Sequence, residues 1–221
     1  MSRQNSVSDN FYDMLFNPIK KHNGSILEVG CGKGTLSDYI HTMGRSIVSL
    51  DIDGLELAKA KQTYPHLKLI QGDAQNLPFS DNSFDILISI ENFEHLPDVD
   101  QHLFEVKRVL KPNGILLIKT PNKIWDTPYW LIIKRWTYKE LKKPGCHIST
   151  QTYYELKKLL ENHGFNVTFL TINALHPDSL LHPSRRQNER YNILAGCLSY
   201  INYYLPNYFK FGLFCVASTR D

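Results

Sequence analysis

The chain has 221 residues, of which 42% are apolar and 21% charged, and its formal net charge is +3. This is the composition of a globular protein that buries a sizeable core. The charge excess is too small to indicate a nucleic-acid binder.

The four cysteines are far apart and form no CxxC pair, which predicts free thiols in a reducing compartment. The first residues, MSRQNSVSDNFYDML, lack the apolar core of a signal peptide. No apolar run reaches the ~20 residues that cross a bilayer. We therefore expect a cytoplasmic protein.

Over residues 20–120, short apolar runs alternate with helical patterns. Strands are predicted at residues 25–29, 46–50, 67–71, 84–90 and 115–119, and helices at residues 33–43, 55–64 and 100–110. The last of these helices is expected to end at a turn formed by residues 111–114. Because the strands are apolar on both faces, they are expected to form a parallel sheet that is covered on both sides.

Beyond Thr120 the pattern changes. Helices are predicted at residues 150–163 and 188–203, and strands at residues 166–172 and 211–218. We expect a single domain over residues 1–221. Within it, residues 1–20 are expected to form a lid segment, and residues 121–148 and 176–207 to form insertions on the substrate side.

Three glycines, Gly30, Gly32 and Gly34, follow the first predicted strand at every second position, in the stretch LEVGCGKG. In a doubly wound sheet such a turn points at the ligand crevice, and glycines let the backbone approach a ligand closely. A tight turn alone would explain one such glycine, whereas three favour a ligand site. A dinucleotide fingerprint would need its third glycine at position 35, where Thr35 stands.

The stretch LEVGCGKG resembles the first motif of class I S-adenosylmethionine-dependent methyltransferases. Four more segments stand in the order of that family: SLDID, GDAQNLPFSDNSFDIL, ENFEHLPD and VKRVLKPNGILLIKTPN. The resemblance covers residues 20–120 well and residues 145–218 loosely. It implies a Rossmann-like α/β fold with a doubly wound, mostly parallel seven-stranded sheet whose last strand is antiparallel. It also implies S-adenosylmethionine as the cofactor and S-adenosylhomocysteine as its product.

A carboxylate at a strand end, Asp51, follows the glycines by about twenty positions and can accept both ribose hydroxyls. It could instead cap the next helix, but Asp53 is better placed for that role. Ile52, between them, would pack on the adenine face. By resemblance, Gly30 and Gly32 line the cofactor.

Four further residues are expected at the cofactor. The resemblance places Asp73 against the adenine amino group, with Ala74 beside it, and Glu28 near the ammonium of the methionine moiety. A solvated turn carboxylate is the alternative for Asp73. A carboxylate inside an apolar strand, such as Glu28, is costly unless it is paired, which favours a functional role. Ile90, at a strand end, is expected to line the methionine arm.

The pattern E-x-x-E-H, formed by Glu91, Glu94 and His95, stands where the methyl group is expected, and His147 could close over the same edge. In one interpretation His95 or His147 is a general base. In a second, all four residues hold a divalent cation, as in a subset of the family that includes ubiquinone-pathway O-methyltransferases and small-RNA 3′-end methyltransferases. In a third, the segment is a helix entry that Glu94 caps. The sequence favours a site without metal, with His95 and His147 as the catalytic candidates.

The aromatic insertions favour a small or lipid-like acceptor, methylated at oxygen, and they could also lie on a membrane surface. Nucleic acid is disfavoured as a partner by the modest charge and by the lack of a D/N-P-P-Y segment after the fourth strand. The alternatives are a nicotinamide-dependent oxidoreductase, a non-catalytic cofactor-binding subunit and an RNA 2′-O-methyltransferase.

Overall fold

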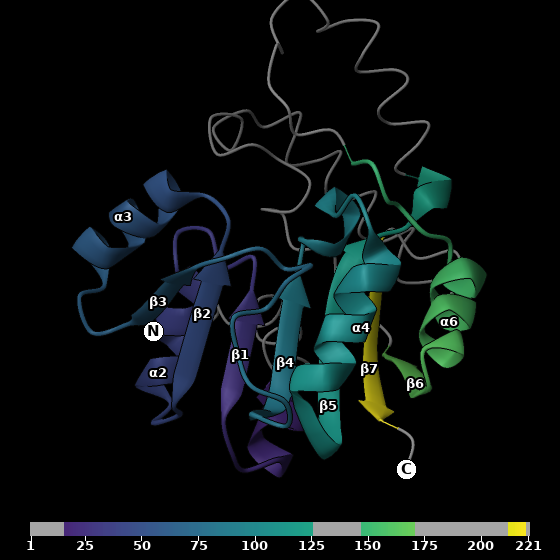
Figure 1. Ribbon diagram of the computed structural model, residues 1–221, viewed down its shortest axis with the longest axis horizontal. Coiled ribbons are helices and arrows are strands. Elements are labelled where there is room, and N and C mark those ends of the chain that lie inside the picture. Colours follow the sequence, from purple (N-terminus) through teal and green to yellow (C-terminus); the bar gives the residue numbers. More distant parts are fainter. Residues whose placement is uncertain (1–15, 126–146, 171–211, 220–221) are drawn as a thin grey trace, which may run out of the picture.

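The structure, a computed structural model, describes residues 16–125, 147–170 and 212–219. Its centre is a seven-stranded sheet in the order β3-β2-β1-β4-β5-β7-β6 (Figure 1). The strands are β1 Ile26–Val29, β2 Ile47–Asp51, β3 Lys68–Gln71, β4 Phe84–Ile90, β5 Leu110–Pro121, β6 Phe165–Leu170 and β7 Gly212–Thr219. The predicted seven-stranded sheet is confirmed.

Parallel pairing joins the first five strands: β1 is parallel to β2 and β4, β2 to β3, and β4 to β5. Strand β7 runs antiparallel to both β5 and β6. The predicted doubly wound α/β fold with an antiparallel last strand is therefore confirmed. The strand order reverses between β1 and β4, and sheets of this kind bind ligands there, beyond the carboxyl ends of the strands.

The helices begin where the local sequence supplies a cap. They are α2 Thr35–Thr42, α3 Gly54–Thr63, the short 3₁₀ helix η1 Phe93–His95, α4 Val99–Val109 and α6 Tyr153–Asn162. Asp53 caps α3 by accepting from Leu55 N at 2.8 Å, as the sequence predicts. A reciprocal pair of hydrogen bonds between Thr152 and Glu155 starts α6. In Figure 1, α4 and α6 lie on the same face of the sheet.

Two apolar cores lie on opposite faces of the sheet, because successive residues of a strand point to opposite sides. In β1, Ile26 belongs to one core and Leu27 to the other. One core packs the strands against α4 and α6, and the other packs them against α2 and the helical residues 16–21. Phe16 and Ile19 are buried in this second core. The last part of the expected lid segment thus belongs to the core.

The turn predicted at residues 111–114 lies inside a strand rather than before it. Strand β5 already begins at Leu110, which pairs with Phe84. The register then shifts, because the next pair joins Ile86 to Ile115, and residues 111–114 form an irregularity within β5. Strand β5 begins before the turn because Leu110 pairs with β4, and the turn residues 111–114 alone do not reveal this pairing.

Residues 1–15, 126–146, 171–211 and 220–221 lie outside the described part of the chain. Most of the lid segment and of both insertions fall there, together with the helix predicted at residues 188–203. The division of the chain into these segments stays a prediction. Among the described residues, no helix is long and apolar enough to cross a membrane.

Asp85, near the start of β4, joins β4 to the beginnings of β1 and β5. Its Oδ2 accepts from Ser25 N at 2.8 Å, from Ser25 Oγ at 3.0 Å and from Lys111 Nζ at 2.8 Å. Desolvation raises the pKa of Asp85, but the hydrogen bonds from Lys111 and Ser25 outweigh it and hold the pKa below its ordinary value. Such a carboxylate stabilises the fold above its unfolded pKa, and the stabilisation is lost as the pH falls through the folded pKa.

We expect Asp85→Asn to lower the free energy of unfolding by about 1 kcal/mol at neutral pH, because the amide keeps the shape but loses the charge that strengthens these bonds. The loss should shrink below about pH 4, near the ordinary carboxyl pKa. Urea unfolding at neutral and acidic pH measures both values. Glu161→Gln, from an exposed pair with Lys157 at 3.8 Å, is the control and should cost less than about 0.5 kcal/mol. Equal losses in the free energy of unfolding for the two variants would contradict the stabilising role of the Asp85 hydrogen bonds.

Candidate active site

The turn that follows β1 is fastened to the end of β2. The N–H of Gly30 donates to the carbonyl of Leu50 at 2.8 Å. The side chain of Asp51 accepts from Gly32 N through Oδ2 at 2.6 Å and from Asp53 N through Oδ1 at 2.9 Å. The carboxylate of Asp51 therefore lies where the carboxyl ends of two neighbouring parallel strands meet.

The three glycines of this turn have left-handed φ values of 77°, 49° and 73°, which other residues rarely adopt. A Cβ at Gly30 would lie 2.5 Å from the side chain of Asn92, and one at Gly34 would lie 3.0 Å from Leu67 Cδ1. A Cβ at Gly32 would meet no atom within 4 Å. Close packing thus requires a glycine at position 30, a Cβ at position 34 would need only a small shift of the Leu67 side chain, and the space beside Gly32 is open.

The buried carboxyl of Glu28 has partners that the sequence did not reveal. Ser37 Oγ donates to Glu28, and Ser49 Oγ donates to Ser37 Oγ at 2.7 Å. Burial raises the pKa of Glu28 to about 7; the hydrogen bond from Ser37 opposes the rise, and the charge of Asp51 adds to it. Ser49 is the neighbour of Glu28 across the β1–β2 pair, so strand register alone points to Ser49, whereas Ser37 reaches Glu28 from helix α2.

The residues predicted on the adenine side lie at the same carboxyl edge of the sheet. Ile52 is 69% exposed, so its side chain is accessible to a flat ring. Asp73 is half-buried, and its Oδ1 accepts from Gln75 N at 2.8 Å. Ala74 is buried in one core, and Ile90 is half-buried against the other. The side chain of Ala74 therefore packs inward.

After β4 the chain turns sharply and enters η1. Glu91 has a left-handed φ of 51° and forms an ion pair with Lys119 of β5. Desolvation raises the pKa of Glu91, but the charge of Lys119 outweighs it and holds the pKa below its ordinary value. The interpretation in which Glu94 caps the next helix is wrong, because Asp98 caps α4.

Glu94 is fully buried and joins two distant segments. Its carboxyl accepts from Thr120 Oγ1 at 3.0 Å, and its backbone carbonyl accepts from Ile148 N at 2.9 Å. These bonds bring His147 to the edge, with its Nε2 4.0 Å from Glu94 Oε1. The rings of His95 and His147 have centroids 5.0 Å apart. The predicted approach of His147 to His95 is thus present in the structure.

Three of the four candidate metal ligands lie together. Ligand atoms of Glu94, His95 and His147 are all within 4.8 Å of one another, whereas Glu91 pairs with Lys119. Burial raises the pKa of Glu94 to about 8, and the charge of Glu91 adds to the rise. Two imidazoles and a carboxylate fit Mn²⁺ or Zn²⁺ better than Mg²⁺, and binding would have to release the proton that Glu94 holds at neutral pH.

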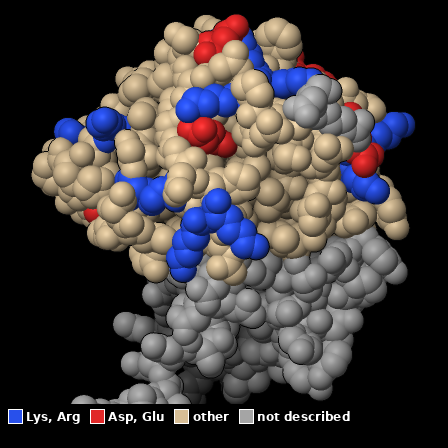
Figure 2. Space-filling view, turned by 90° about the horizontal axis from the view of Figure 1, so that it is seen from below, with Lys and Arg blue, Asp and Glu red and all other residues tan. Residues whose placement is uncertain are grey.

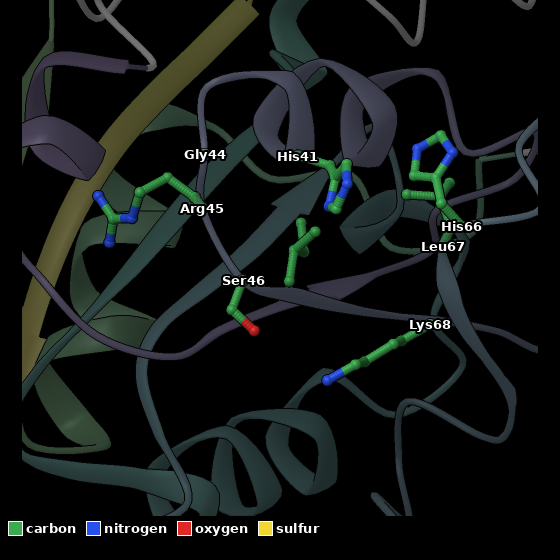
Figure 3. A pocket seen from close by; sticks show the side chains of 8 residues that line it. His41, Gly44, Arg45, Ser46, His66, Leu67 and Lys68 are labelled. Carbon is green, nitrogen blue, oxygen red and sulfur yellow. The ribbon is translucent and has the colours of Figure 1, made fainter.

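A groove of about 390 Å³ lies at the opposite edge of the sheet, where β2 and β3 begin (Figure 3). It is lined by His41, Gly44, Arg45, Ser46, Ile47, His66, Leu67 and Lys68. In the view of Figure 2, from below, Lys and Arg side chains are spread over this face of the molecule, with Asp and Glu side chains among them. The guanidinium of Arg45 donates to the backbone carbonyls of Ile19 and His22. Because the groove lies where β2 and β3 begin and the glycine turn lies where β1 ends, the two are at opposite edges of the sheet.

Comparisons with known proteins agree with the geometry. Residues 27–118 match the family described as methyltransferase domain. A Mycolicibacterium smegmatis protein named "Probable S-adenosylmethionine-dependent methyltransferase" is 33% identical over 142 residues, which are 64% of this chain and 52% of that protein. The fatty-acid O-methyltransferase of the same organism is 36% identical over 109 residues, which are 48% of this chain and 40% of that protein.

The crystal structure of a SAM-dependent methyltransferase from Archaeoglobus fulgidus has the same fold, with a TM-score of 0.62, 17% identity and coverage of 95% of this chain and 92% of that one. The chain spans about half the length of the curated relatives it matches. Over residues 27–118 the chain matches a methyltransferase domain, and its sheet and glycine turn are those expected of a class I S-adenosylmethionine-dependent methyltransferase. The cofactor of this family is S-adenosylmethionine.

We expect Gly30→Ala to abolish or greatly weaken cofactor binding, because the new methyl group would collide with Asn92 and deform the turn. Gly44→Ala is the matched control: Gly44 has the same φ of 77°, but a Cβ there meets nothing within 4 Å. The left-handed φ alone costs about 1–2 kcal/mol of stability, which both variants should show. Calorimetric titration with S-adenosylhomocysteine should find at least a tenfold loss in Gly30→Ala only. Equal affinities would contradict the packing argument.

Proposed function

We propose that this chain transfers the methyl group of S-adenosylmethionine to an oxygen atom of a small, lipid-like acceptor. The observation that carries the proposal is the open space at Gly32 beside Asp51. Apart from Gly32 itself and its two chain neighbours, no residue has an atom within 4 Å of a Cβ placed at Gly32, and Asp51 accepts from the N–H of the same residue. A nucleoside can therefore lie against bare backbone while its ribose hydroxyls reach a carboxylate.

In this proposal the cofactor spans the carboxyl edge from the adenine loop after β3 to the exit of β4. The residues that hold it are Glu28, Gly30, Gly32, Asp51, Ile52, Asp73, Ala74 and Ile90. With a pKa of about 7, Glu28 is partly ionised at neutral pH, and a ligand ammonium nearby would favour its carboxylate form. Ala74 would contribute through its backbone, because its side chain is buried.

Apolar side chains near the exit of β4 support a lipid-like acceptor. Ile148 is 62% exposed, and Ile124 and Trp125 are 37% and 36% exposed. Their two segments lie side by side, because Lys123 N donates to Gln151 O at 3.0 Å. The relative that methylates fatty acids at oxygen points to the same acceptor class. Contact with a membrane surface and a cytoplasmic location remain part of the proposal.

Methyl transfer places modest demands on the protein. The sulfonium already activates the methyl group, so the site has to orient the acceptor in line and exclude water, which supplies about 7–11 kcal/mol. A carboxylic acid is deprotonated at neutral pH and needs no base, whereas a hydroxyl needs one. We assign His95 and His147 to this step, in which they bind the acceptor oxygen or take its proton.

We expect Asp51→Asn to weaken S-adenosylhomocysteine binding about tenfold to a hundredfold, because hydrogen bonds to a charged group contribute about 1.5–3 kcal/mol. Asp53→Asn is the matched control, since it removes the same charge two positions away and asparagine also caps helices. Isothermal titration calorimetry measures both variants. Tight binding of NADH and none of S-adenosylhomocysteine would support the oxidoreductase instead. Binding without turnover on any acceptor would support a non-catalytic subunit.

We expect His147→Ala to act differently on two acceptors of equal chain length. With dodecanol, kcat should fall about 10²–10⁴-fold, because the hydroxyl loses its base. With dodecanoate, which needs no base, the change should appear mainly in KM. Transfer of a radiolabelled methyl group measures both. His163→Ala is the control, because His163 follows the C-terminal end of α6, whereas His147 precedes this helix, and the side chain of His163 pairs with Asp100.

Chelation tests the competing metal interpretation in the same assay. We expect activity to survive EDTA, in line with a site in which the histidines act directly. Loss of activity with EDTA and recovery with Mn²⁺ would favour a metal held by Glu94, His95 and His147. Unchanged kinetics of His147→Ala with both acceptors would exclude this residue from the reaction.

A further inference from the structure

One face of α4 carries three polar side chains that reach the loop after β3. His102, Glu105 and Arg108 stand three residues apart, so they lie on one side of the helix. His102 is fully buried and Glu105 is 6% exposed. All three contact residues 73–81, which we call the adenine loop because it begins with Asp73. We call the three side chains the α4 clamp.

The first two members of the clamp bind backbone groups of the loop. His102 Nδ1 lies 2.8 Å from the carbonyl oxygen of Ala74, and because a carbonyl only accepts, Nδ1 must carry the proton. Glu105 Oε2 accepts from Leu77 N at 2.8 Å. Each bond is buried, so its loss would leave a polar backbone group without a partner.

Arg108 uses its guanidinium to fix the second half of the loop. It donates to the carbonyls of Phe79 and Leu77 at 2.7 and 2.9 Å. It also donates twice to Glu105, at 2.9 and 2.7 Å, and once to Asp81, at 2.8 Å. These contacts engage all five N–H donors of an arginine. A lysine could not reproduce this planar arrangement.

The start of α4 holds the loop as well. The backbone N–H of Asp98 donates to Gln75 Oε1 at 2.7 Å, and Gln101 Nε2 donates to the carbonyl of Gln75 at 3.2 Å. Asp73 itself accepts from Gln75 N. The position of the Asp73 carboxylate is therefore set through the loop by α4, a helix that does not belong to the glycine turn.

We propose that His102 and Arg108 are positioning residues that give the site its preference for adenine over other purine bases. The proposal rests on the proposed function, in which Asp73 accepts from the adenine amino group. Hypoxanthine carries a keto oxygen at that position, and an oxygen facing a carboxylate is repelled. The discrimination depends on a carboxylate that cannot turn away, and the α4 clamp supplies that constraint.

The test compares S-adenosylhomocysteine with S-inosylhomocysteine, whose base carries a keto oxygen in place of the amino group and a proton on the adjacent ring nitrogen N1. Calorimetry gives the ratio of their dissociation constants for each protein. The wild-type protein should favour the adenine compound at least tenfold. The ratio should fall toward one in Arg108→Met and in His102→Leu. His102→Asn, whose amide can donate in place of Nδ1, should keep most of the preference.

Arg45→Met is the matched control for Arg108→Met, because it also removes a guanidinium that donates hydrogen bonds to backbone carbonyls. Arg45 binds the carbonyls of Ile19 and His22 at the opposite edge, so its variant should lose stability without a change in the ratio. If Arg108→Met does not fold, Arg108→Lys and the two His102 variants carry the test. For each variant, the ratio of the two dissociation constants is measured on folded protein only, so that a lower ratio cannot come from unfolding.

The outcomes separate the two proposals. If the α4 variants weaken both nucleosides by the same factor, the clamp has only a structural role and the inference is overturned. The inference is also overturned if the wild-type protein binds both nucleosides equally. If the wild-type protein binds neither, the proposed function itself fails.

Discussion

The hydrogen bonds between the glycine turn and the end of β2 are the contacts on which the rest of the site depends. Leu50 holds Gly30 through its carbonyl, and Asp51 holds Gly32 through its side chain. A carboxylate oxygen can accept more than one hydrogen bond, so Asp51 can hold the turn and still accept ribose hydroxyls. The residue that shapes the site is thus also the residue that the sequence assigns to the sugar.

The two ends of the proposed cofactor are held by separate parts of the fold. In the proposal, the turn and β2 would hold the sugar and the amino-acid tail, and Glu28 lies buried behind them, hydrogen-bonded to Ser37, which in turn accepts from Ser49. The loop that is proposed to meet the adenine is held by α4. Both supports place polar groups in the interior, where each must be satisfied to avoid a large desolvation cost. Arg108 meets this condition with five hydrogen bonds and lowers the pKa of Glu105, which stays ionised.

The sequence predicted the fold well because its strands and helices have clear local patterns. The glycines, Asp53 as a cap and the strand ends at Asp51 and Ile90 all follow from residues close in the chain. The start of β5 was misplaced because Leu110 pairs with Phe84, a distant partner. The contacts around Glu94 and the α4 clamp were missed for the same reason, since they join segments that only the sheet brings together.

The carboxyl groups of Glu91 and Glu94 contribute little net charge at the exit of β4, where the acceptor is proposed to bind. Glu91 is balanced by Lys119, and burial beside Glu91 raises the pKa of Glu94 to about 8, so this carboxyl holds its proton at neutral pH. In the proposed reaction a positive sulfonium meets a negative oxygen, and both products are neutral. Opposite charges combine more readily where water is excluded and the local dielectric is low. A nearly neutral, partly apolar edge therefore suits this reaction better than a strongly charged one, and it suits a lipid-like acceptor for the same reason.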